Sequence, residues 1–122
     1  MAAVAGAIAE AVVREALVDG PAGEGSSTGP GSPMGAIMEN GGDIFLWMPR
    51  EVVIGLYAGK SSLSGRIGLA VPPGPLAVCS SSGTMGHALS FGRADLATVV
   101  ATDGALADAA ATLAGNLVRS PG

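Results

Sequence analysis

A four-residue turn, Asn-Gly-Gly-Asp at Asn40–Asp43, is the feature that most constrains the fold of this chain. It stands between segments 36–39 and 44–48, which are short and mostly apolar. Adjacent glycines at the centre of a tight turn supply the positive φ angles that match the twist of two antiparallel strands. Asparagine and aspartate beside the glycines are common turn residues as well. The pattern predicts a β-hairpin, and therefore an antiparallel sheet.

The remainder of the chain reads as helix, strands and a closing helix, separated by glycine and proline. Residues 2–18 are rich in alanine with helical spacing, and Asp19-Gly20-Pro21 supplies a stop signal. Further strands are predicted at 52–58, 66–71, 76–80 and 96–101, and Asp103 is placed to cap a helix over 104–118. This order predicts one α+β domain over residues 1–122, with an antiparallel sheet and helices on one face.

Composition decides how such a core must be built. Apolar residues make up 48% of the chain but aromatic residues only 3%, so Ala, Val, Leu and Ile must form a closely packed core. The first helix is apolar on most sides, which predicts that it is buried. Residues 20–35 are low in complexity and rich in Gly, Ser and Pro. They are expected to form a flexible loop, or alternatively a binding loop.

Charge and cysteine content exclude several classes of function. The net charge is -4 and the six basic residues are scattered singly, which argues against nucleic-acid binding. No stretch has the roughly 20 apolar residues of a membrane span, and the first residues lack the basic start of a signal peptide. We therefore expect a cytoplasmic protein without a membrane partner. The single cysteine, Cys79, is expected to be a buried structural thiol.

The closing helix places a carboxylate and a hydroxyl on one side. Asp108 and Thr112 are spaced i, i+4 and point the same way. A carboxylate and a hydroxyl form part of an oxygen-ligand site of the kind that Mg²⁺ prefers. The alternative interpretation is a solvated face opposite an apolar stripe made of Leu106, Ala110, Leu113 and Leu117.

Two other segments carry candidate binding residues. In the turn, Gly41 and Gly42 would let a substrate approach the backbone while Asp43 accepts a hydrogen bond, although a plain turn explains the same residues. The polar run Ser82-Gly83-Thr84 follows a predicted strand and could hold a phosphate through backbone N–H groups and hydroxyls. His87 is a weak catalytic candidate, with a structural role as the alternative.

In this order, the turn, the serine–glycine loop and the Ala-Asp-Ala-x-x-Thr helix resemble the ApbE superfamily. The chain is closer still to a branch of ApbE-related proteins. The matching segments are residues 1–7, 39–45, 57–59, 81–87, 90–95 and 105–116. The resemblance implies a T-fold-related domain. It also implies that the ApbE-like pattern begins upstream of Met1, so that the domain here is N-terminally truncated and incomplete.

The best-understood members of that superfamily transfer FMN from FAD to a protein with the help of magnesium. By this resemblance, Asp108 and Thr112 would bind Mg²⁺, while the two short segments would line the flavin-nucleotide site. The candidate flavin-binding residues are Asn40, Gly41, Gly42, Asp43, Ser82, Gly83 and Thr84. The implied partners are FAD and an acceptor protein.

One departure from the transferases is visible, because the Asp-Pro-x-Thr-Gly text that follows their histidine is absent after His87. Two alternative functions therefore stay open: a non-catalytic binding or assembly module, and a metal-dependent FAD pyrophosphate hydrolase. An incomplete sheet predicts an unpaired edge or an uncovered apolar face, and hence self-association.

Overall fold

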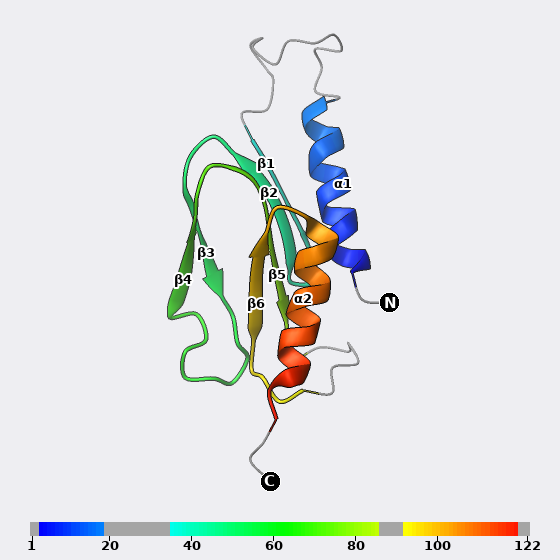
Figure 1. Cartoon of the computed structure of the whole chain (residues 1–122). Coiled ribbons are helices and arrows are strands. Elements are labelled where there is room, and N and C mark those ends of the chain that lie inside the picture. The colour runs from blue at the N-terminus through cyan, green and yellow to red at the C-terminus, as the bar shows by residue number, and fades with distance from the viewer. Residues whose placement is uncertain (1–2, 19–34, 86–91, 120–122) are drawn as a thin grey trace.

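The computed structural model describes residues 3–18, 35–85 and 92–119, which form two helices and six strands (Figure 1). Most of segment 20–35, together with His87, lies outside the described residues. The elements in chain order are α1 (Val4–Val18), β1 (Ala36–Asn40), β2 (Asp43–Met48), β3 (Val52–Leu56), β4 (Ile67–Val71), β5 (Gly74–Ser81), β6 (Ala97–Ala101) and α2 (Gly104–Leu117). The predicted elements are thus confirmed, with small shifts at their ends.

A four-stranded antiparallel sheet in the order β1-β2-β5-β6 forms the centre of the fold. The predicted diglycine turn joins its first two strands, and Asn40 pairs with Asp43 across it. Gly41 and Gly42 have φ angles of 66° and 98°, the conformation for which glycine is suited at a hairpin turn. The turn therefore fixes the register that places Asp43 at the first position of β2.

Both helices cover the same face of this sheet (Figure 1), as the sequence predicted. Helix α1 packs on β1 and β2, while α2 packs on β5 and β6. The buried side chains between the layers are mostly small, with Phe45 as their one aromatic member among the described residues. They are Ala9, Val13, Phe45, Ala77, Cys79, Ala107 and Ala111.

The other face of the sheet is covered by β3 and β4, which pair only with each other and form a separate two-stranded sheet. The run of strands is therefore divided between two sheets. Proline at positions 49 and 72–73 stands near the junctions, where it removes the N–H that a continuous ladder needs. Leu46, Val71 and Val78 form a second buried cluster between these sheets. The result is three layers: helices, central sheet and hairpin.

The two helices cross in direct contact at Gly6 and Gly104. A Cβ atom at either glycine would overlap the backbone carbonyl oxygen of the other, so only glycine fits on both sides. In Figure 1 the two helices start near this crossing and run away from each other. The scarcity of aromatic residues predicted close packing, and at this crossing the backbones of the two helices pack directly against each other.

The interpretation of α2 as a helix with a leucine stripe toward the core is wrong. Leu106, Leu113 and Leu117 are 62%, 62% and 69% exposed, whereas Ala107, Asp108, Ala111 and Gly115 are buried. The small residues face inward because they let the helix approach the sheet and α1, which leucine side chains would prevent.

Helix α1 is likewise less buried than predicted. Val4, Ile8 and Val12 are each 44–46% exposed. Its inward face is formed by Gly6, Ala9 and Val13, again because small side chains permit the close crossing. Within the described residues, neither helix has the length and apolar character that crossing a membrane would require.

Candidate functional site

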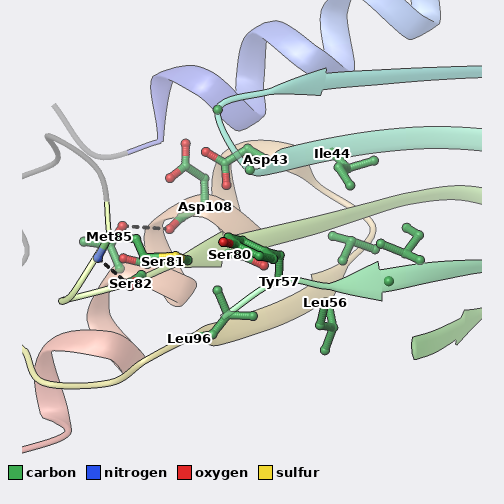
Figure 2. A pocket seen from close by; sticks show the side chains of 16 residues that line it. Asp43, Ile44, Leu56, Tyr57, Ser80, Ser81, Ser82, Met85, Leu96 and Asp108 are labelled. Atoms are coloured by element: carbon green, nitrogen blue, oxygen red, sulfur yellow. Dashed lines mark hydrogen bonds between the residues drawn. The ribbon is translucent and has the colours of Figure 1, made fainter. Parts of the chain in front are cut away.

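A cavity of about 590 Å³ opens beside the diglycine turn, bounded by the end of the β3 strand, the C-terminal end of β5 and the inner side of α2 (Figure 2). Its lining combines turn backbone, acidic and hydroxyl groups, and apolar side chains. The lining residues are Gly41, Gly42, Asp43, Ile44, Ile54, Gly55, Leu56, Tyr57, Val78, Ser80, Ser81, Ser82, Met85, Leu96, Asp108 and Thr112.

Six of the residues singled out in the sequence meet at this cavity. The β1–β2 turn contributes Gly41, Gly42 and Asp43, the segment after β5 contributes Ser82, and α2 contributes Asp108 and Thr112. The first and last of these residues are more than 60 positions apart in the sequence, and the fold brings them to one cavity. The solvated-face alternative for Asp108 is therefore excluded, since its side chain is 9% exposed.

Three other candidates point elsewhere. The Asn40 amide donates to the carbonyl oxygen of Ala5 in α1, at 3.5 Å. The Gly83 N–H donates to the carbonyl oxygen of Ala94 at 3.0 Å, while the Thr84 hydroxyl lies 3.3 Å from Ser82 Oγ. None of these three lines the cavity. Their contacts hold the protein's own segments together, and Ser82 Oγ itself accepts from the N–H of Thr84 and of Met85.

Asp43 is the most perturbed acid of the site. It is 8% exposed, and its Oδ1 is buried without a hydrogen-bond partner in the described structure. Burial, together with the nearby charge of Asp108, raises the pKa of the Asp43 carboxyl to about 6; the Cys79 side chain and Ser80 backbone partly oppose the shift. Figure 2 shows the carboxylates of Asp43 and Asp108 beside each other.

Asp108 is held in place by the start of the other helix. Its Oδ2 accepts a 3.0 Å hydrogen bond from the backbone N–H of Gly6, in the first turn of α1. That turn contains no acidic residue of its own, so the Asp108 carboxylate satisfies an N–H left open at the helix N-terminus. The carboxylate is thereby fixed in orientation at the edge of the cavity.

Thr112 is oriented by its own helix. Its hydroxyl donates a 3.1 Å hydrogen bond to the carbonyl oxygen of Asp108, one turn earlier. Because the proton is used in this bond, the oxygen lone pairs are what Thr112 can offer to the cavity. The i, i+4 spacing read from the sequence thus produces two oxygen groups on the same inner surface.

The donor set of the cavity fits a hard divalent cation that also binds a ligand. Asp43 and Asp108 bring two carboxylates together, and one oxygen of Asp43 lacks a partner. Mg²⁺ is typically bound by one or two carboxylates plus substrate phosphates and water. The described residues contain no cluster of three or more His, Cys, Asp or Glu side chains, so a fully protein-made metal cage is not built there.

Cys79 is the buried structural thiol predicted from the sequence. It is 0% exposed, and its thiol donates a hydrogen bond to the carbonyl oxygen of Gly104, with 3.7 Å between Sγ and the oxygen. Burial, with the charge of neighbouring Asp43, raises the pKa of the Cys79 thiol to about 12. The thiol therefore remains protonated and unreactive at neutral pH.

Sequence reasoning missed the apolar part of the cavity. Ile44, Leu56, Tyr57 and Leu96 line it, although none of them was a candidate site residue. The signal available was weak: Tyr57 ends an apolar run directly before Ala58-Gly59, where a turn interrupts the strand. What brings these residues to the site is the packing of the β3–β4 hairpin over the central sheet.

Fold and site together define an ApbE-like α+β domain with an acidic, oxygen-lined cavity beside a diglycine hairpin. A family model described as "AbpE bacteria" matches residues 1–122, and the chain belongs to this ApbE-like family. The resemblance to an ApbE-related branch is confirmed at this level.

Curated relatives include UPF0280 proteins of archaea. A UPF0280 protein of Methanothermobacter thermautotrophicus is 45% identical over 122 residues, covering 99% of this chain and 43% of the relative. UPF0280 proteins of Methanococcus vannielii and Methanothrix thermoacetophila are 44% and 46% identical, covering 99% and 97% of this chain and 46% and 45% of those proteins. The chain therefore spans less than half the length of these relatives.

Proposed function

We propose that this protein binds a flavin nucleotide with Mg²⁺ and takes part in the transfer of FMN from FAD to an acceptor protein. The observation that carries the proposal is the meeting of Asp43 and Asp108 beside the diglycine turn, with one buried carboxylate oxygen left unpartnered. Membership of an ApbE-like family supports the choice of flavin.

The charges in the cavity support a metal-dependent ligand. Its lining includes two acids and no lysine or arginine among the described residues. A diphosphate would be repelled by these carboxylates unless a divalent cation lay between them. The residues that would hold the cation are Asp43, Asp108 and Thr112, each through a side-chain oxygen.

A bound Mg²⁺ would supply Lewis-acid polarisation of the FAD pyrophosphate and stabilise charge on the departing AMP. The chain's own groups position this chemistry. Gly6 fixes Asp108 through its N–H, and Gly41 and Gly42 leave the turn backbone open to the nucleotide. The added positive charge would also lower the pKa of Asp43, keeping its carboxylate ionised at neutral pH.

The test is binding followed by product analysis. The protein is titrated with FAD in the presence and absence of Mg²⁺, and then incubated with a candidate acceptor protein. Mass spectrometry follows AMP and an FMN adduct on the acceptor. We expect Mg²⁺-dependent FAD binding that is weakened at least tenfold in Asp108→Asn. Glu51→Gln, an exposed carboxyl outside the cavity lining, is the matched control and should bind as the unaltered chain does.

The outcomes separate the candidate functions. AMP together with an FMN-modified acceptor supports the transferase. Free FMN and AMP without an adduct would indicate a metal-dependent FAD pyrophosphate hydrolase instead. Binding with no release of AMP leaves a non-catalytic flavin-binding module, and absence of FAD binding by the folded protein contradicts the proposal.

A further inference from the structure

The cavity has two chemically different ends, and only one of them is used by the proposed cation site. Figure 2 shows the acids Asp43 and Asp108 gathered at one end, while Ile44 and Leu56 lie away from them and Tyr57 lies between, beside Ser80. All the lining residues other than the two acids are uncharged. A ligand that fills both ends must therefore combine a cation-bound anionic group with a neutral, apolar group.

Tyr57 is placed to contact such a neutral group. It follows β3 directly, lines the cavity, and is 69% exposed. An aromatic side chain with this exposure is not part of the core, and its ring face is open to a ligand. Flat heteroaromatic rings stack on tyrosine faces with useful affinity and little dependence on ring identity.

The backbone next to Tyr57 is also suited to a flat ligand. Gly55 lines the cavity, and no atom lies within 4 Å of the position that a Cβ would occupy there. This leaves a bare stretch of strand against which a planar ring can lie. Met85 also lines the cavity and packs its thioether on Gly59, adding a polarisable group that favours contact with aromatic rings.

We infer that Tyr57 forms a ring subsite, in which it stacks a planar heteroaromatic ring of a nucleotide whose diphosphate lies toward Asp43 and Asp108. The inference rests on the proposed function for the identity of the diphosphate. Two rings of one dinucleotide, the isoalloxazine and the adenine, share this stacking chemistry. Uncharged lining explains why either ring would be accepted without an ion pair.

The experiment measures ligand binding by the intact chain with Mg²⁺ present. FMN binding is followed by quenching of flavin fluorescence, and ADP binding by calorimetry. Tyr57→Ala should weaken the stacked ligand about tenfold to hundredfold, whereas Tyr57→Phe, which keeps the ring face, should bind within about twofold of the unaltered chain. If Tyr57→Ala weakens the binding of FMN, the isoalloxazine occupies the subsite. If it weakens the binding of ADP, the adenine does.

Val53→Ala is the matched control. Val53 lies on β3, four positions before Tyr57, has almost the same exposure, 70%, and does not line the cavity, so its variant should bind both ligands normally. Circular dichroism establishes that each variant is folded. If Tyr57→Ala binds FMN and ADP as tightly as the unaltered chain, the ring subsite is overturned while the proposed function stands. Absence of Mg²⁺-dependent nucleotide binding by the unaltered chain overturns both.

Discussion

The Asp108 carboxylate in α2 accepts a hydrogen bond from the N–H of Gly6 in α1, and this contact ties the candidate site to the crossing of the two helices. A matching hydrogen bond runs in the opposite direction, because Glu10 of α1 accepts from the N–H of Gly104, at the start of α2, at 2.6 Å. Each helix thus supplies a carboxylate to the N-terminus of the other. Stability and ligand binding should therefore be linked through this pair of helices.

Gly6→Ala should destabilise the fold, because its methyl group would overlap the carbonyl oxygen of Gly104, a backbone atom that cannot rotate away. Overpacking of this kind costs about 1–3 kcal/mol in the free energy of unfolding. Urea denaturation followed by circular dichroism measures it. Gly55→Ala is the control, since open space surrounds that position, and a comparable loss there would contradict the explanation.

Glu10→Ala should lower stability through both of its hydrogen bonds. Its Oε1 accepts from Arg14 Nε at 2.7 Å, and its Oε2 accepts from the Gly104 N–H. Hydrogen bonds to charged groups contribute about 1.5–3 kcal/mol, and the partly exposed Arg14 contact falls below that range. Chemical denaturation should show a loss of about 2–3 kcal/mol in the free energy of unfolding, and Glu51→Ala should show almost none.

Asp43→Asn should change how stability depends on pH. Asp43 has a pKa of about 6 in the folded protein against an ordinary value of 3.8, so the folded state holds its proton more tightly. This contribution favours folding fully below about pH 4 and is lost as the pH rises through 6. Asparagine removes the charge, so the free energy of unfolding of the variant should exceed that of the unaltered chain by about 3 kcal/mol at pH 8 and differ little from it at pH 4.

Urea denaturation at several pH values measures that difference in the absence of Mg²⁺. The control is Asp95→Asn, which alters an exposed carboxyl and should run parallel to the unaltered chain. A constant offset between Asp43→Asn and the unaltered chain from pH 4 to pH 8 would show that the charge of Asp43 is not the cause.

Thr112→Val and Thr112→Ser separate the hydroxyl from the rest of the side chain. Serine retains the oxygen and its bond to the Asp108 carbonyl, so Mg²⁺-dependent FAD binding should stay within about twofold. Valine keeps the shape but removes the oxygen, and we expect binding to weaken about tenfold. Equal binding by both variants in a fluorescence titration would remove Thr112 from the cation site.

Leu113→Lys should reduce self-association. Leu106, Leu113 and Leu117 form an uncharged, exposed stripe on the outer side of α2, and contiguous apolar surface of this kind favours association with a second copy. Light scattering during size-exclusion chromatography should give a lower average mass for the variant. Leu63→Lys, at an exposed leucine in the β3–β4 connection, is the control, and an equal decrease there would indicate a general charge effect.

Local patterns in the sequence were sufficient for the elements and for part of the site. The diglycine turn demanded positive φ angles, and Asp103 caps α2 as predicted, accepting from the Leu106 N–H at 2.7 Å. The spacing of Asp108 and Thr112 fixed their common side through helix geometry alone. These features depend on neighbours within one turn or one hairpin, which the sequence displays directly.

Which side of each helix faces inward depended on tertiary packing. Hydrophobicity alone favoured the leucines of α2, but the contact between Gly6 and Gly104 requires small residues at the crossing, so the leucines turn outward and Asp108 turns in. The division of the strands into two sheets likewise placed Tyr57 at the cavity. The sequence by itself determined the turn, the cap of α2 and the helical spacing, because these are local. Only the tertiary structure decided which faces meet, because that choice depends on how closely distant backbones can approach.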